Sequence, residues 1–273
     1  MSAALPAVEH LLLRLEQGVL HLTLNRPESR NAMSPAMLAE IESVFAAIAE
    51  DRAIRAVVLR GAGGHFCAGA DLKSMMGSSQ QAAPAGAADP VAAVNRRFGT
   101  MLRKVGYAPQ VVIAICEGGV LGGGFGLACV SDIALAHVDA KFGLPETTRG
   151  LPPAQIAPFV VERIGLTQAR RLALTGAQFR GAEALRLGLV HHSFSSEDEL
   201  QTQLASLLEQ VRLCAPEANR VTKAILLNVG KLEMDAVLDD AAGRFAACVR
   251  GPEAPEGIGA FLQKRRPRWA DAD

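Results

Sequence analysis

The sequence predicts an α/β protein built on a mostly parallel sheet whose strands are joined by crossover helices. Short apolar runs alternate with segments of helical periodicity as far as about residue 153. Two of these runs end in glycine-rich turns, and the rest of the chain reads as almost entirely helical. With 273 residues the chain is long for one domain and short for two, so we expect one globular unit with a peripheral helical segment.

Composition restricts the classes of function. Lysine plus arginine number 28 and aspartate plus glutamate number 28, which argues against a nucleic-acid or membrane-surface role. No apolar run approaches the roughly 18 residues of a membrane helix, and the first ten residues lack the pattern of a signal peptide. The five cysteines show no CxxC spacing and read as reduced core residues. We therefore expect a soluble, cytoplasmic protein.

The chain opens with a predicted β-hairpin. Residues 8–16 and 19–25 alternate between apolar and polar, with Gln17 and Gly18 as a tight turn between them. Ser34 followed by Pro35 is typical of a helix start. The further elements expected in the alternating part are helices at 35–51 and 91–105 and strands at 56–60, 111–116 and 133–136.

Two segments of the chain suggest a loop and a covering layer. Residues 77–90 consist mainly of Gly, Ser, Gln, Ala and Pro, which predicts a mobile loop of the kind that can act as a lid. A series of helices should follow residue 153 and either cover the sheet or pack on another subunit. They are expected at 154–164, 167–175, 182–187, 197–214, 216–229, 232–249 and 255–264.

The stretch EGGVLGGGFGLACVSD, residues 117–132, predicts a glycine turn that leads from a strand into a helix. Glycines allow close backbone approach and leave amide N–H groups free at a helix start, where the macrodipole favours negative charge. A second glycine turn, FCAGAD at 66–71, follows another predicted strand. Two such turns could donate to one oxyanion, and one donor typically contributes about 3 kcal/mol of transition-state stabilisation. Tight turns made only for packing are the alternative.

Other common site motifs do not occur in the sequence. It contains no Walker A run, GxSxG elbow or zinc-ligand spacing. After Gly122 and Gly124, Leu127 stands where a dinucleotide-binding motif needs its third glycine. We therefore do not expect a nicotinamide enzyme.

At these motifs the sequence resembles the enoyl-CoA hydratase/isomerase family, also called the crotonase family. The matching segments are LNRPESRNAMS, HFCAGADLK, EGGVLGGGFGLACVSD, KFGLPE and IGLTQARRLALTG, in this order along the chain. The resemblance implies a crotonase-like ββα spiral core at 1–200 and a C-terminal helical trimerisation region at 201–273. It also implies an acyl-CoA thioester substrate, a homotrimer or a dimer of trimers, no metal, and no cofactor, since coenzyme A is part of the substrate.

The resemblance also assigns site residues. The backbone amides of Ala68 and Gly123 match the family's oxyanion hole. The positions that match regions holding the substrate and its coenzyme A moiety are Ser29, Arg30, Ala32, Ala68, Gly69, Ala70, Asp71, Leu72, Gly122, Gly123, Phe261 and Lys264.

The family's hydratases usually carry two catalytic glutamates, and this sequence keeps one. Gly126 stands at the first position and Glu146 at the second. Glu146 follows Pro145 in an apolar stretch, where desolvation can bring its pKa towards working pH. Arg149, three residues later, is a candidate partner for a substrate carboxylate, because guanidinium binds carboxylate bidentately. A surface position or a pair with Glu146 is the alternative for Arg149.

Three functions follow from this reading. The text LPPAQIAPFVVERIGLTQARRLALTG resembles hydratases of isohexenylglutaconyl-CoA and 3-methylglutaconyl-CoA, which favours a hydratase acting on a branched, carboxylated enoyl-CoA. A Δ3,Δ2-enoyl-CoA isomerase with Glu146 as its single base is the alternative. A non-catalytic acyl-CoA-binding protein is the alternative from another class.

Overall fold

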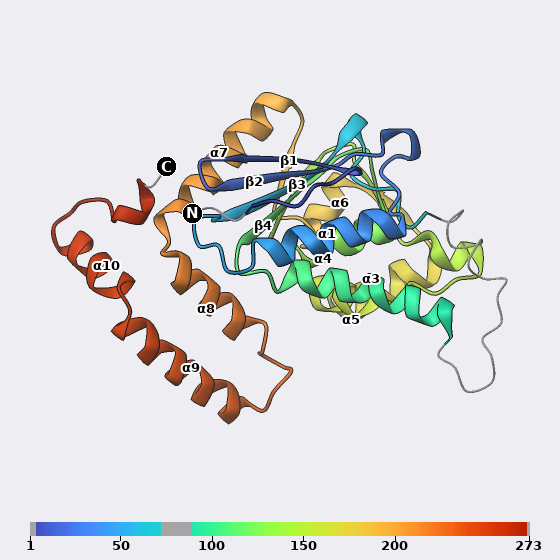
Figure 1. The fold of residues 1–273 in the computed structure, drawn as a ribbon. Coiled ribbons are helices and arrows are strands. Elements are labelled where there is room, and N and C mark those ends of the chain that lie inside the picture. Colours follow the sequence, from blue (N-terminus) through green and yellow to red (C-terminus); the bar gives the residue numbers. More distant parts are fainter. Residues whose placement is uncertain (1–3, 72–88, 272–273) are drawn as a thin grey trace.

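A six-stranded sheet forms the centre of the computed structural model, which describes residues 4–71 and 89–271 (Figure 1). The strand order is β1-β2-β3-β4-β6-β9, and only the β1 and β2 pair is antiparallel. The strands are β1 (Leu11–Glu16), β2 (Val19–Leu24), β3 (Ala56–Gly61), β4 (Val111–Cys116), β6 (Ile133–His137) and β9 (His192–Phe194). The prediction of a mostly parallel sheet is thus confirmed.

The opening hairpin forms where the alternation predicts it. Glu16 pairs with Val19, and the two turn residues Gln17 and Gly18 have φ values of 46° and 70°. Positive φ at both central residues is the geometry whose twist matches that of the flanking strands.

Helices connect the strands and continue to the C-terminus. Ser34 caps α1 by accepting a hydrogen bond from the Met37 N–H, as the Ser-Pro start predicts. The helices that cover the sheet are α1 (Pro35–Ala47), α3 (Pro90–Gly106), α4 (Gly123–Val130), α5 (Ala157–Thr175), α6 (Gly181–Arg186) and α7 (Glu197–Leu213). The later ones are α8 (Pro216–Leu226), α9 (Met234–Arg250) and α10 (Glu253–Leu262). Short 3-10 helices lie at η1 (Pro27–Ser29), η2 (Ala62–Gly64), η3 (Pro145–Arg149) and η4 (Arg268–Ala270).

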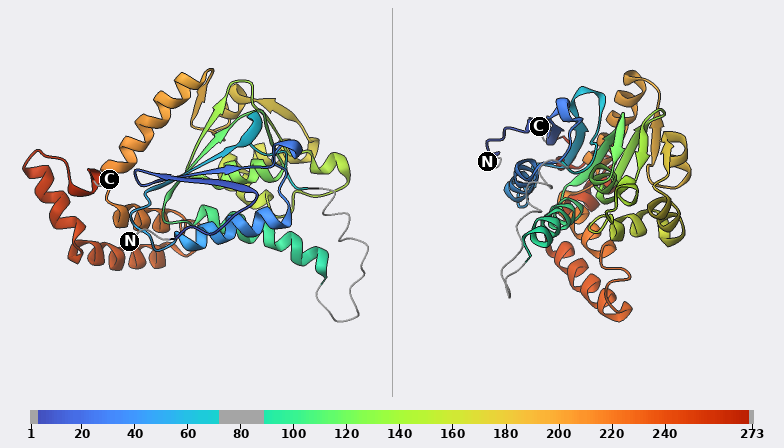
Figure 2. Two further views of the ribbon diagram at one scale, coloured as in Figure 1. Left: turned by 45° about the horizontal axis from the view of Figure 1, so that its top comes forward. Right: turned by 90° about the vertical axis from the view of Figure 1, so that its right-hand side faces the viewer.

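The sheet separates two apolar cores. On one face, side chains of α1, α3, α4 and α5 pack against the strands in the larger core. On the other face, Leu200, Leu204 and Val211 of α7 pack against Val58 and Ile113. The expected boundary between residues 200 and 201 therefore falls inside a helix that packs on the sheet (Figure 2).

A second, three-stranded sheet was not predicted. It consists of β5 (Gly119–Leu121), β7 (Lys141–Gly143) and β8 (Gln178–Arg180). The expectation that the chain after residue 153 is almost entirely helical is therefore wrong at β8 and at β9. Each of these strands has three residues, which is too short for an alternating pattern, and each forms because a distant partner strand supplies its hydrogen bonds.

The break expected between two helices near residue 165 is present within α5. Gly165 has φ 76° and ψ 157°, which interrupts the helical backbone. The loop expected at 77–90 falls, up to residue 88, outside the described residues, as does Leu72. Within residues 4–71 and 89–271, no helix combines the length and apolar character needed to cross a membrane.

Helices α8, α9 and α10 extend away from the sheet (Figures 1 and 2). The Lys223 ammonium of α8 lies 2.7 Å from an Asp132 carboxylate oxygen and donates to the Gln110 carbonyl at 3.1 Å. Asp132 also accepts the Val112 N–H at the start of β4, at 2.7 Å. These contacts fix α8 at the edge of the sheet where β4 and β6 begin.

We predict that Lys223→Met lowers the free energy of unfolding by roughly 1–3 kcal/mol, because it leaves the Asp132 carboxylate without its cation. The Lys223 and Asp132 side chains are only 13% and 29% exposed. Chemical denaturation measures the change. The control is Lys231→Met, whose partner Glu162 is 52% exposed, and its loss should stay below about 1 kcal/mol. Equal losses for both variants would contradict the prediction.

Candidate active site

Three segments lie side by side where the two glycine turns meet: β5, the turn at 66–71 and the segment around Met33. The amide of Cys67 donates to the Gly119 carbonyl at 2.9 Å, and the Leu121 amide donates back to Cys67 at 2.9 Å. On the other side, the Met33 amide donates to the Gly69 carbonyl at 2.8 Å. The second turn is thus held between β5 and the segment before α1, as two isolated β-bridges also indicate.

The Ala68 amide is not available to a substrate. Its N–H donates to the Arg30 carbonyl at 2.9 Å, so the prediction that Ala68 supplies an oxyanion donor is wrong. Ala70 is exposed, and its N–H finds no acceptor within the described part of the chain. The motif predicted the turn but not which amide faces outward, because that depends on the neighbouring segments whose carbonyls accept from the other amides.

The Ala70 N–H is thus one candidate oxyanion donor. A second candidate donor, the Gly123 N–H, lies at the start of α4. Gly123 is the first residue of this helix, where the helix supplies no acceptor for the N–H. A Cβ built on Gly69 would lie 3.7 Å from the Gly123 nitrogen, so the two glycine turns meet as predicted. Gly122 before it has φ 49° and ψ −111°, a conformation that requires glycine.

The loop that should contact coenzyme A is fixed beside these turns. Arg26 lies 3.1 Å from the Asp71 carboxylate and donates to the Ala32 carbonyl at 2.7 Å. The Ser29 hydroxyl donates to the Arg26 carbonyl at 3.0 Å, and the Arg30 side chain is exposed. The structure therefore brings Ser29, Arg30 and Ala32 next to the turn at 68–71.

Sequence reasoning did not single out Asn31, which organises this loop. Its side chain is fully buried, accepts the Arg26 N–H at 2.9 Å and donates to the Ala62 and His65 carbonyls at 2.9 and 2.6 Å. Its φ of 57° is one that asparagine tolerates better than most residues. The available signal was an asparagine in the polar stretch RPESRN, just before the Ser34-Pro35 helix start.

Glu146 reaches the site because β7 pairs with β5. The Gly122 amide donates to the Gly143 carbonyl at 3.1 Å, and η3 turns back immediately after it. A Cβ built on Gly122 would lie 2.6 Å from the Glu146 Oε1, so the carboxylate lies directly over the glycine backbone. Behind it, the rings of Phe142 and Phe179 stack at 5.7 Å and hold β7 and β8 together.

Burial raises the pKa of the Glu146 carboxyl above its ordinary value. The positive charge of Arg149 opposes this shift. The Glu146 Oε2 is buried and has no hydrogen-bond partner within the described residues. A carboxyl whose charged form is poorly solvated is suited to exchanging protons near neutral pH.

The wall beyond Glu146 is apolar. A Cβ built on Gly126 would lie 3.1 Å from Leu102 Cδ1 and 3.2 Å from Ile156 Cγ2. One on Gly123 would lie 2.8 Å from Phe98 Cζ. The position at which the family's hydratases carry their first glutamate is thus closed by hydrocarbon side chains, and Glu146 is the carboxylate that lies beside this apolar wall.

Two predicted contact residues do not join this site. Phe261 is 81% exposed near the end of α10, and Lys264 follows that helix. Helix α10 lies at the end of the molecule opposite the start of α3 (Figures 1 and 2). Within one chain, therefore, these residues are not brought together with Glu146.

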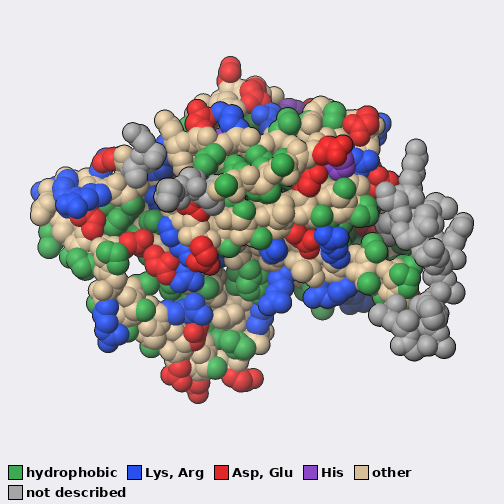
Figure 3. All heavy atoms as spheres, in the orientation of Figure 1, with side chains coloured by type: hydrophobic (Ala, Val, Ile, Leu, Met, Phe, Trp, Pro, Cys, Tyr) green, Lys and Arg blue, Asp and Glu red, His purple; other side chains and the backbone are tan. Residues whose placement is uncertain are grey.

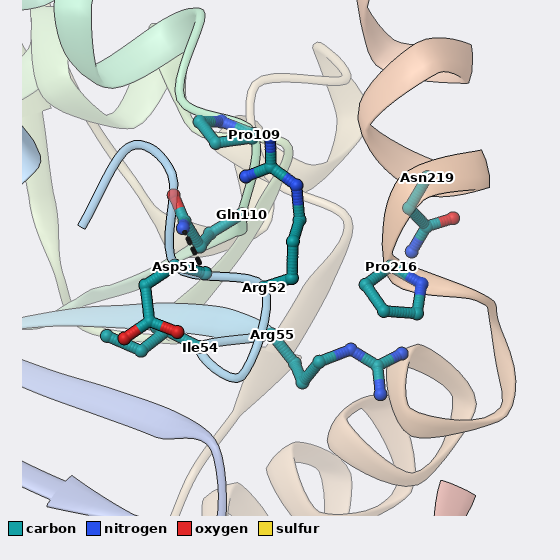
Figure 4. Close-up of a pocket in the computed structure, with 8 residues that line it drawn as sticks. All are labelled: Asp51, Arg52, Ile54, Arg55, Pro109, Gln110, Pro216 and Asn219. Atoms are coloured by element: carbon teal, nitrogen blue, oxygen red, sulfur yellow. Dashed lines mark hydrogen bonds between the residues drawn. The ribbon is translucent and has the colours of Figure 1, made fainter. Parts of the chain in front are cut away.

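Two open pockets lie away from this site. One of about 10 Å³ is lined by Arg52, Arg55, Gln110 and Asn219, between the sheet and α8 (Figure 4). A larger one, of about 610 Å³, follows α8 past Tyr107. Among the described residues no cluster of His, Cys, Asp and Glu could hold a metal ion. Figure 3 shows charged side chains of both signs interspersed over the visible face.

Comparison with known proteins identifies the class. The family model described as Enoyl-CoA hydratase/isomerase matches residues 14–272. An enoyl-CoA hydratase/isomerase from Marinobacter aquaeolei is 57% identical with a TM-score of 0.92, over 96% of this chain and 99% of that one. AtuE from Pseudomonas aeruginosa is 58% identical with a TM-score of 0.91, over 96% and 100%. The 2,3-dehydroadipyl-CoA hydratase of Escherichia coli is 31% identical, over 95% and 98%.

The spiral of strands and helices with its helical C-terminal region is that of an enzyme with the crotonase fold. The chain belongs to the enoyl-CoA hydratase/isomerase family. The family resemblance seen in the sequence motifs is thereby confirmed.

We predict that Glu146→Gln makes the protein more stable at pH 8 and leaves its stability unchanged near pH 4. Because burial raises the pKa of this carboxyl from its ordinary 4.5, its contribution to stability is fully present below that value. The contribution is lost as pH rises through the raised pKa, and glutamine escapes that loss. Thermal unfolding across this pH range measures the difference. A variant that is less stable than the native protein at pH 8 would contradict the prediction.

Proposed function

We propose that the protein is a hydratase that adds water across the C2=C3 double bond of a branched, carboxylated enoyl-CoA, such as 3-methylglutaconyl-CoA or isohexenylglutaconyl-CoA. The observation that carries this proposal is the half-buried Glu146 carboxylate, which lies over the backbone of Gly122 and whose Oε2 has no hydrogen-bond partner within the described residues. The similarity to a relative named for a dehydroadipyl thioester supports a substrate with a distal carboxylate.

The proposed reaction uses two amides and one carboxylate. The thioester oxygen accepts from the N–H groups of Ala70 and Gly123, which stabilise the negative charge that develops on it. Glu146 takes a proton from a water molecule while the water oxygen forms its bond to C3 and the electrons of the double bond move into the enolate. The same proton then passes from Glu146 to C2, which leaves the carboxylate ready for another cycle.

Binding of coenzyme A is proposed for the loop and turn around Asp71. The exposed Arg30, with Ser29 and Ala32, lies beside the turn that contains Gly69. Phe261 and Lys264 would have to come from a second copy, which is why we also propose a homotrimer or a dimer of trimers. The support is the set of exposed apolar side chains on the outer helices: Leu226, Met234, Leu238, Phe245, Val249, Ile258, Phe261 and Leu262.

A cytoplasmic setting is also proposed. All five cysteines are free, and Cys67, Cys116 and Cys129 are buried thiols. Unpaired cysteines in this number are typical of a reducing compartment.

A Δ3,Δ2-enoyl-CoA isomerase is the second candidate. One buried base next to an apolar wall can move a proton between C2 and C4 without any water. A non-catalytic acyl-CoA-binding protein is less well supported, because a carboxylate oxygen buried without a hydrogen-bond partner, such as the Glu146 Oε2, is unfavourable unless the group has a chemical task.

We predict that the purified protein adds one water to 3-methylglutaconyl-CoA or isohexenylglutaconyl-CoA, as detected by mass spectrometry of the thioesters. Glu146→Gln should lower kcat by roughly 10²–10⁴-fold, the contribution typical of general acid–base catalysis, while retaining binding. The control substrates are crotonyl-CoA and 3-hexenoyl-CoA. A new species of unchanged mass from 3-hexenoyl-CoA alone would establish the isomerase instead, and retained turnover by Glu146→Gln would remove its assigned role.

Arg149 has a separate electrostatic role in this proposal. It is exposed, and its charge lowers the pKa of Glu146. We predict that Arg149→Gln moves the acidic limb of the kcat/KM profile to higher pH, since the base then protonates more readily, while Arg149→Lys keeps the profile. If Arg149 also holds the substrate carboxylate, KM rises for glutaconyl thioesters only. An unchanged pH profile would exclude the electrostatic role.

A further inference from the structure

Gln155 extends over the middle of α3, where the helix carries a glycine. The turn before α5 is closed, because the Ile156 and Ala157 amides both donate to the Pro153 carbonyl, at 3.1 and 2.9 Å. A Cβ built on Gly99 would lie 2.1 Å from the Gln155 Oε1. Only glycine at this position lets the carboxamide come so close. Glycine is otherwise unfavourable inside a helix, so the contact is a specific feature of this chain.

The neighbours of this contact line the site. On α3, Phe98 and Leu102 flank Gly99 and face Gly123 and Gly126 of α4. On the other side, Ile156 packs against the same Gly126. The carboxamide therefore stands at the border of the apolar wall that begins beside the Gly123 amide.

The Gln155 carboxamide is not engaged by other groups of the protein. Within the described residues it takes part in no hydrogen bond, and the residue is half-buried. Its polar atoms are not among the fully buried ones that lack a partner, so the carboxamide is accessible, and a substrate group that pairs with it would be recognised selectively.

We propose that Gln155 determines specificity by donating its carboxamide N–H to the distal carboxylate of the acyl chain, an inference that rests on the proposed hydratase function. The thioester oxygen at Gly123 and the reacting carbons below Glu146 fix where the chain begins. Four residues at about 1.5 Å each, roughly 6 Å, lead from Gly122, the N-cap of α4, to Gly126 and so to the wall that Gln155 borders. A neutral amide binds the carboxylate without forming an ion pair with Glu146, and thus leaves that base free.

The test compares two substrates that differ in the distal carboxylate, 3-methylglutaconyl-CoA and 3-methylcrotonyl-CoA. Gln155→Leu should lower kcat/KM for the carboxylated thioester by about 10- to 100-fold, as expected for a lost hydrogen bond to a charged group. For the other thioester the change should be less than about twofold. Gln155→Glu should be worse than Gln155→Leu on the carboxylated substrate alone, because like charges repel.

Two further variants keep the test decisive. Gly99→Ala should reproduce the selective loss, since its methyl group displaces the Gln155 carboxamide. Gln168→Leu, on the half-buried glutamine of α5, is the matched control and should change neither substrate. An equal loss on both substrates, or none, would overturn the assignment of Gln155. Failure of the native protein to hydrate the carboxylated thioester would overturn the proposed function itself. The native protein is assayed first, so this outcome is distinguished from a failure of the Gln155 assignment.

Discussion

The approach of the Glu146 carboxylate to the backbone of Gly122 is the constraint on which the site depends. With Oε1 at 2.6 Å from where a Cβ would stand, any side chain at this position would displace the carboxylate from its place. The positive φ of Gly122 serves the same end, because it turns the chain from β5 into α4. One residue thus allows both the close carboxylate and the free amide of Gly123. The pairing of β5 with β7 then sets the distance between the Glu146 carboxylate and the Gly123 amide.

Much of the surrounding structure serves to hold backbone groups in place. Asn31 satisfies three backbone groups from two loops, and Arg26 joins the same loop to the Asp71 turn. In contrast, the Glu146 Oε2 receives no such partner. In this region, therefore, the unsatisfied carboxylate oxygen lies where a proton has to move. The polar groups of the surrounding loops have hydrogen-bond partners. This is the distribution expected when an unsatisfied polar group is confined to the reacting residue.

The contacts that fix the fold lie at the other edge of the sheet. Lys223, Asp132 and Gln110 join α8 to the beginnings of β4 and β6, whereas the glycine turns follow the ends of β3 and β4. Parallel strands place all their carboxyl ends at one edge, and ligands bind there in many α/β proteins. Stability at one edge and chemistry at the other can therefore be altered separately.

The sequence by itself determined the class of fold, the order of the long elements and the residues of the two glycine turns. These depend on local periodicity, on Ser34 as a cap and on the conformations that only glycine adopts, so the signal lies within a few residues. The tertiary structure decided the rest. It alone showed that Arg30 takes the Ala68 amide and leaves that of Ala70, that three-residue strands form a second sheet, and that Gln155 crosses Gly99. Each of these features depends on residues far away in the chain. The sequence of a short segment does not indicate which distant residue will form hydrogen bonds with it.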